Sequence, residues 1–196
     1  ADMWVHEGFT AYSESLFVDY HFGTKLSNEY VIGTRKNIQN NRPIIGTYDV
    51  NYSGSSDMYS KGSNMLHTLR QIVDDDSKWR NILRELNEEF YHQTVTSTQI
   101  ENYMSELVGR DLEPFFDQYL RDTRIPAFTF SFKDGQFFYR WEDCAENFDM
   151  PVKFSFDRDM QWLYPKTEWQ SIEMPEGFNK YAVDPNFYVA MRKTKL

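Results

Sequence analysis

The first helix-like stretch of the chain carries acidic side chains that could bind a metal ion. His6 and Glu7 lie near its start, and Glu14 follows Glu7 after one heptad. At about 100° per residue of an α-helix, the two glutamates lie within about 20° of each other. A carboxylate can bind zinc directly, and a second carboxylate can orient an imidazole that binds the same ion. One hypothesis is therefore that Glu7 is a zinc ligand and that Glu14 orients a ligand histidine.

The same residues also fit a purely structural role. A zinc motif of the form H-E-x-x-H would need a histidine where the chain has Thr10. On a helix His6 points about 100° away from Glu7, and a lone histidine is commonly a hydrogen-bonded structural residue. Glu7 and Glu14 can be solvated residues of an amphipathic helix, with Glu7 stabilised by the positive helix N-terminus. Periodicity alone leaves both interpretations open.

Helical periodicity dominates the first part of the chain. Apolar residues recur every three or four positions over residues 3–22, with Gly23 as the expected end, and a stretch rich in Asn, Gly, Ser and Pro follows over 34–56. A second helix is predicted from a cap at Ser56-Asp57. Three more helices are expected, with starts and ends assigned to these residues: Ser77, a Thr96/Gln99 capping box, Gly109, Pro114 and Pro126.

The period changes to two after Pro126. Phe128, Phe130 and Phe132 alternate with other residues, and Asp134-Gly135 predicts a hairpin turn. The fold class is therefore predicted to be α+β, with a helical part over 1–124 and a small antiparallel, sandwich-like β module over 125–196.

Composition and charge disfavour several kinds of partner. The formal charge of −9 disfavours binding to nucleic acid or to anionic lipid. The longest apolar runs are well short of the roughly 18 residues that a membrane span needs. Cys144 is the single cysteine, so an internal disulfide is excluded and the cysteine is expected to be a packed side chain.

Two short segments resemble the M1 family of zinc aminopeptidases. The first, WVHEGFTAYSE over residues 4–14, resembles the family segment W-x-N-E-G-F-A-x-Y-x-E. The second, DMYSKGS over residues 57–63, resembles Y-x-K-G-A. A weaker third match runs from Gly109 to Pro126. His6 stands where many members have asparagine, and Thr10-Ala11 departs from the usual order, but the glutamate is retained.

The resemblance implies a set of roles for these residues. Glu7 would be the third zinc ligand, Tyr59 would donate a hydrogen bond to the oxyanion of the tetrahedral intermediate, and Glu14 would orient a ligand histidine. The helical part would then belong to a thermolysin-like catalytic domain. Both the H-E-x-x-H motif and the G-x-M-E-N segment would lie before Ala1.

The expected function follows from these roles. The chain is predicted to be part of a zinc metalloaminopeptidase that removes N-terminal residues from peptides. Its partners would be peptide substrates and the missing N-terminal part of the same chain. These 196 residues alone are expected to be inactive and metal-free. Export to the periplasm or cell surface is expected from the resemblance, with a cytoplasmic location as the alternative.

Two other functions stay open at this stage. One is a non-catalytic scaffold whose β module binds a polypeptide or glycan through Trp141, Trp162 and Trp169. The other is an M1-like enzyme that hydrolyses an epoxide, because such an enzyme would share the zinc residues. Purely structural interpretations are also open. The β module would then support the helices, and Tyr59 would be an ordinary aromatic residue at a helix start. Lys61 would be a solvated charge beside a close-packing Gly62.

Overall fold

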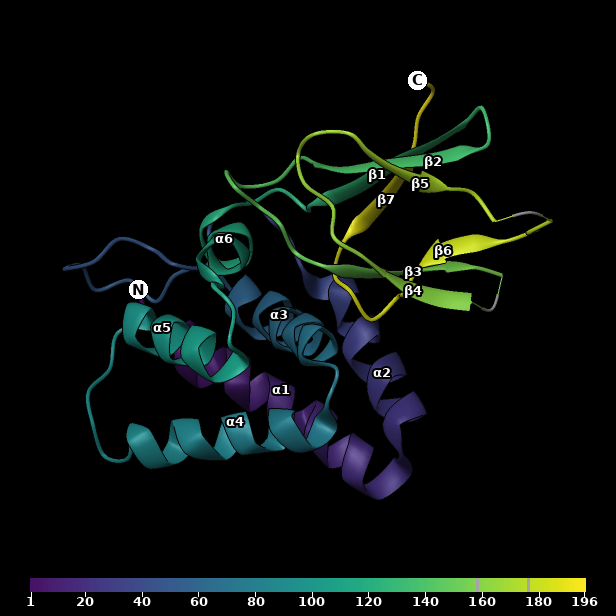
Figure 1. Cartoon of the computed structure of the whole chain (residues 1–196). Helices are drawn as coiled ribbons and strands as arrows, with labels where there is room; N and C mark the ends of the chain where they lie inside the picture. The colour runs from purple at the N-terminus through teal and green to yellow at the C-terminus, as the bar shows by residue number, and fades with distance from the viewer. Residues whose placement is uncertain (158, 176) are drawn as a thin grey trace.

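The computed structural model describes residues 1–157, 159–175 and 177–196, and has a layer of helices beside two small sheets (Figure 1). The helical elements are α1 (Trp4–Phe22), α2 (Thr24–Gly33), the short 3-10 helix η1 (Thr34–Asn37), α3 (Asp57–Val73), α4 (Asp76–Glu89), α5 (Ser97–Val108), α6 (Glu113–Phe116) and the π-helical turn η2 (Asp117–Arg121). The strands are β1 (Ala127–Lys133), β2 (Gln136–Glu142), β3 (Val152–Phe156), β4 (Asp159–Leu163), β5 (Gln170–Glu173), β6 (Tyr181–Val183) and β7 (Ala190–Lys193). The predicted α+β class is confirmed.

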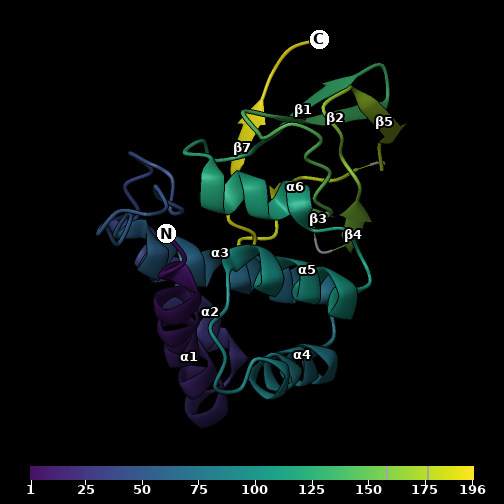
Figure 2. The same cartoon turned by 90° about the vertical axis from the view of Figure 1, so that its left-hand side faces the viewer.

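The helical part largely follows the signals in the sequence. α1 ends at Gly23, whose φ of 89° suits glycine, and α5 begins with the Thr96/Gln99 capping box and ends at Gly109. Within the described residues, no helix is both long and apolar enough to cross a membrane. Figure 2 shows α6 between the larger helices and the sheets.

Several local predictions were wrong. α2 was not expected, because Thr24–Gly33 has no clear apolar stripe. The N-cap of α4 is Asp75, whose carboxylate accepts from the backbone N–H groups of Ser77 and Lys78. At the start of α3, Ser56 makes no side-chain cap bond, and the Ser55 hydroxyl accepts from the Asp57 N–H instead.

The buried face of α1 also differs from the predicted stripe. The apolar periodicity predicts a stripe of Val5, Phe9, Tyr12, Leu16 and Tyr20. The buried residues are instead Trp4, Gly8, Tyr12 and Ser15, and Tyr20 is exposed. Small residues allow neighbouring helices to approach α1 closely, and an apolar periodicity does not count glycine or serine. The buried face of α1 is therefore determined by side-chain size as well as by hydrophobicity.

The β module consists of two facing sheets, with strand orders β5-β2-β1-β7 and β4-β3-β6. The hairpin β1–β2 turns at Asp134 and Gly135, both with positive φ, as predicted. Aromatic side chains fill the space between the sheets: the ring of Phe154 lies 5.4 Å from that of Phe128 and 4.9 Å from that of Phe137. These contacts form the core of a small sandwich.

One strand pairing corrects the purely antiparallel prediction. β7 pairs with β1 in parallel, with Ala127 opposite Ala190. The chain leaves β6 in the other sheet, passes along the helices and returns beside β1 in the same direction. The predicted division between residues 124 and 125 falls in the connection between η2 and β1.

Candidate functional site

Glu7 and Tyr59, two of the residues with predicted chemical roles, lie where α1 crosses α3. Gly8 and Gly62 meet at this crossing: a Cβ atom added to Gly62 would lie 3.1 Å from Gly8 Cα. One added to Gly8 would lie 3.2 Å from the carbonyl oxygen of Met58. The two backbones are therefore in direct contact, which only glycine permits at both positions. The prediction that Gly62 is a close-packing residue is confirmed.

This crossing brings the backbones of Glu7 and Tyr59 to one place in the fold. Glu7 immediately precedes Gly8, and Tyr59 immediately follows Met58. The Glu7 side chain is half-buried, and Tyr59 is 43% exposed, so both are accessible from outside the chain. The crossing therefore holds the backbones that carry this carboxylate and this phenol close together.

The N-terminal end of α1 is fixed by a chain of hydrogen bonds that runs from a buried residue to the surface. The Trp4 indole donates to the Ser97 hydroxyl over 2.7 Å, and that hydroxyl donates to the Asp2 carboxylate over 2.5 Å. The Tyr48 hydroxyl, from the long segment before α3, donates to the same carboxylate over 2.8 Å. Glu7 lies one helical turn after Trp4, so these contacts hold the backbone that carries it.

Glu14 has a defined partner on α2. Its carboxylate accepts a hydrogen bond of 2.5 Å from the Tyr30 hydroxyl, and this bond raises the pKa of Tyr30. Glu14 is exposed and lies on the same helix as Glu7, seven residues further along. One of its oxygens is thus oriented by Tyr30, and no described histidine bonds to it.

Lys61 is buried, which corrects the expectation of a solvated charge. It is 1% exposed, and its ammonium group donates to the Asp122 carbonyl over 2.8 Å. Burial lowers the pKa of Lys61 to about 8, although the carboxylates of Asp57 and Asp122 counteract the shift. Lys61 therefore joins α3 to the segment that leads into the β module.

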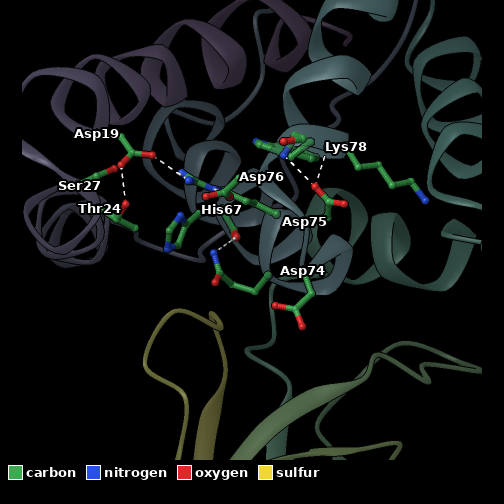
Figure 3. A network of polar contacts seen from close by, with 12 residues as sticks. Asp19, Thr24, Ser27, His67, Asp74, Asp75, Asp76 and Lys78 are labelled. Atoms are coloured by element: carbon green, nitrogen blue, oxygen red, sulfur yellow. Dashed lines mark hydrogen bonds and ion pairs between the residues drawn. The ribbon is translucent and has the colours of Figure 1, made fainter.

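The opposite end of the crossing helices is held by an ion-pair network (Figure 3). Arg70 on α3 donates to Asp19 on α1 over 2.7 Å and to Asp76 on α4 over 2.8 Å. Asp19 also accepts from Thr24 at the start of α2. The Arg70 side chain is 9% exposed, so its charge is almost fully enclosed by this pairing. The network fixes four helices relative to one another, so its role is structural.

His6 lies on a different surface from the ion-pair network. It is exposed and lines a groove between α1 and α4, together with Phe9, Leu86 and His92. It makes no side-chain hydrogen bond with a described residue, contrary to the usual role of a lone histidine. The groove contains neither Glu7 nor Tyr59, so the structure does not bring His6 into their arrangement.

Comparison with known proteins gives the family. The model of the peptidase family M1 domain matches residues 1–119, which include Glu7, Glu14 and Tyr59. The chain belongs to peptidase family M1. Comparison with curated proteins gives no match.

A solved aminopeptidase structure has the same fold over almost the whole chain. The crystal structure of Legionella pneumophila aminopeptidase A in complex with aspartic acid matches with a TM-score of 0.71 and 14% identity. The match covers 97% of this chain and 24% of that chain, so the M1 segment described here spans about a quarter of the length of its structural neighbour. The similarity includes the β module as well as the helices.

The ligand set of this M1 segment is incomplete for a catalytic zinc ion. Catalytic zinc has three protein ligands and an open position. Among the described residues, no three His, Cys, Asp or Glu side chains are grouped so that they could hold a metal ion. Glu7 could serve as one ligand, but the described residues do not fit the ion by themselves.

Sequence reasoning did not identify the residues that support the backbones of Glu7 and Tyr59. Asp2, Asp57 and Ser97 are polar anchors that bind segments far away in the chain. Trp4 belongs to the M1-like segment, but spacing in the sequence could not show that Ser97 accepts its hydrogen bond. A buried aspartate at the first position of α3, directly before Met58-Tyr59, offered the only signal, as a possible cap.

Proposed function

We propose that this chain forms part of the catalytic domain of a zinc-dependent aminopeptidase, together with the β module that follows it. The observation that carries the proposal is the crossing at Gly8 and Gly62, which holds Glu7 and Tyr59 on two rigid helices within the M1 match. Peptidase function fits the family. Zinc, the aminopeptidase reaction and the residue roles below are our inference.

Glu7 would supply one carboxylate ligand, and two further ligands would come from another part of the complete polypeptide. Zinc, when bound, would polarise the scissile carbonyl and activate water. Within this chain, the exposed Tyr59 hydroxyl would donate a hydrogen bond to the carbonyl oxygen as negative charge develops on it. Glu14, held by Tyr30, would use its second carboxylate oxygen to orient a ligand imidazole.

Peptides with a free N-terminus are the proposed substrates. The Legionella structure is named an aminopeptidase A and is complexed with aspartic acid, which is consistent with binding of an amino acid in this fold. We further propose that the residues described here do not turn over peptides alone, because a single carboxylate is too weak a zinc site. The proposed partner that completes the site is the N-terminal part of the same polypeptide.

The test uses the complete polypeptide and two conservative variants. Glu7→Gln removes the charged ligand oxygen, so we expect zinc per protein, measured by atomic emission, to fall well below one and activity on an aminoacyl anilide to be lost. Tyr59→Phe should keep the zinc and KM but lower kcat by about 10²–10³-fold, the usual cost of losing one oxyanion donor.

Two controls make this result specific. Glu29→Gln changes an exposed glutamate of α2 and should leave zinc content and activity unchanged. An epoxide substrate assayed in parallel separates peptidase from epoxide hydrolase activity. Full zinc content and unchanged turnover in Glu7→Gln would sink the proposal, and the non-catalytic scaffold would take its place.

A further inference from the structure

The β module contacts the helix that carries Tyr59 through the turn between β6 and β7. The backbone N–H of Tyr188 in this turn donates to the Thr68 hydroxyl on α3 over 3.0 Å. His67, also on α3, bonds to the Asn186 side chain over 3.0 Å. The Tyr119 hydroxyl of η2 donates to the Tyr188 carbonyl over 2.8 Å. Both backbone polar groups of Tyr188 are therefore bound to the helical part, and the residue is buried.

The hydroxyl of Tyr188 continues this connection toward the start of α3. It accepts a hydrogen bond of 2.9 Å from the side-chain amide of Asn40, which lies in the long segment before α3. Asn40 has a φ of 49°, a left-handed conformation that asparagine adopts more readily than most residues other than glycine. The Tyr188 hydroxyl is the partner that holds its side chain.

Asn40 in turn is bound to the first residue of α3. The backbone N–H groups of Gln39 and Asn40 donate to the two carboxylate oxygens of Asp57, over 2.9 Å and 2.7 Å. Asp57 is 1% exposed, so its charge depends on these donors and on the helix N-terminus. Tyr59 follows Asp57 after one residue, in the same first turn of the helix.

We infer that Tyr188 is a positioning residue for Tyr59, acting through Asn40 and Asp57. The inference rests on the proposed function, in which the Tyr59 hydroxyl stabilises the oxyanion. The first turn of a helix lacks part of its internal hydrogen bonding, so its geometry depends on contacts such as that of Asp57. The β module thus contributes to the orientation of a functional side chain that it does not touch.

The decisive variant is Tyr188→Phe in the complete enzyme. It removes a single hydrogen-bond acceptor, while the ring and both backbone contacts of Tyr188 remain. We expect kcat to fall about tenfold and KM to change less than about twofold, because a misplaced catalytic group weakens transition-state binding selectively. The matched control is Tyr139→Phe, the same change in the same module, at a buried tyrosine of β2 whose hydroxyl bonds to no described residue. It should leave kcat unchanged.

A second variant and a local measurement test whether the effect of Tyr188 on Tyr59 passes through Asn40 and Asp57. Asn40→Gly removes the amide donor but still permits a positive φ, so it should lower kcat to a similar extent. The double variant should be no worse than either single variant, as expected for residues that act as one unit. Hydrogen exchange should become faster at the amides of residues 39–40 and 57–60 in Tyr188→Phe, and not in Tyr139→Phe.

The outcomes separate this inference from the proposed function. If Tyr59→Phe lowers kcat while Tyr188→Phe behaves like Tyr139→Phe, the positioning role is wrong and the proposed function stands. If kcat falls in Tyr188→Phe without faster exchange at residues 57–60, the route through Asp57 is wrong. If Tyr59→Phe itself has no effect, the proposed role of Tyr59 fails and this inference fails with it.

Discussion

At the scale of single residues, α3 is notable for the polar side chains that it buries. Five of them, Asp57, Lys61, Asn64, His67 and Arg70, recur at helical spacing and bind other elements. Each has at least one hydrogen-bond partner, which offsets the cost of removing it from water. α3 therefore acts as the polar centre of the helical part, and its contacts fix the neighbours of Tyr59.

His67 should make stability depend on pH. Burial lowers its pKa to about 4, Arg70 and Arg35 act in the same direction, and Asn186 and Asp184 oppose the shift. Unfolded His67 has a pKa near 6.5, so the unfolded state binds the proton first as pH falls. The contribution to stability is complete above about pH 6.5 and is lost progressively down to about pH 4.

The expected size of this effect can be measured by urea unfolding. Between pH 7 and pH 5, His67 should account for a loss of about 2 kcal/mol in the free energy of unfolding. His67→Gln keeps a donor for Asn186 but does not titrate, so its stability should change less over that interval by about the same amount. Equal pH dependence in the two proteins would show that folding does not lower the pKa of His67.

At the scale of elements, the geometry of the site depends on how closely α1 and α3 approach. Gly8 and Gly62 allow backbone contact at the crossing, and the Arg70 network holds the other ends of the two helices. A larger residue at the crossing would separate the helices or force a shift along their axes. Either change would alter the relative positions of Glu7 and Tyr59.

Gly62→Ala should therefore destabilise the fold. Its Cβ would lie 3.1 Å from the rigid Gly8 backbone, and we expect a loss of about 1–3 kcal/mol in unfolding free energy, the typical cost of overpacking. The control is Gly33→Ala on α2, where the added Cβ has open space and φ is ordinary. That variant should be neutral or more stable by up to about 1 kcal/mol. Chemical denaturation of both variants decides the point: Gly62→Ala as stable as wild type would mean that the crossing is not tight.

At the scale of the whole molecule, the β module and the helical part share one apolar core. Phe116 of α6, Phe128 of β1 and Phe187 of the β6–β7 turn are all buried in it. Of the three tryptophans considered for ligand binding, Trp141 is in this core and donates to the Met150 carbonyl, Trp162 lies under Lys153, and Trp169 stacks with Arg140. Their engagement within the module favours a supporting role for it.

Removal of the β module should uncover the helical part. Truncation of the complete polypeptide after Thr123 would leave Thr68, His67 and Tyr119 without their partners in the β6–β7 turn. It would also expose Phe116. We expect lower soluble yield and faster limited proteolysis near α6, because buried polar groups lose bonds and apolar surface is exposed. An unchanged melting temperature and proteolysis pattern would contradict a supporting role.

The sequence by itself determined the features that depend on local chemistry. The period of 3.6 before Pro126 and the period of two after it predicted the α+β fold, and the ends at Gly23, Gly109 and Gly135 followed from backbone conformations that glycine favours. The segments around Glu7 and Tyr59 indicated the M1 family, which the family model then confirmed. Such signals depend on neighbouring residues only, so they can be identified in the sequence without knowledge of distant contacts.

Only the tertiary structure decided how distant segments meet. The contact of Gly8 with Gly62, the buried state of Lys61, the parallel pairing of β7 with β1 and the connection from Tyr188 to Asp57 join residues that are far apart in the chain. The sequence predicted Gly62 as a close-packing residue but not its contact with Gly8, and it predicted Lys61 as a solvated charge. Their roles depend on packing and on the pairing of buried polar groups, which arise only when the helices and the β module are assembled.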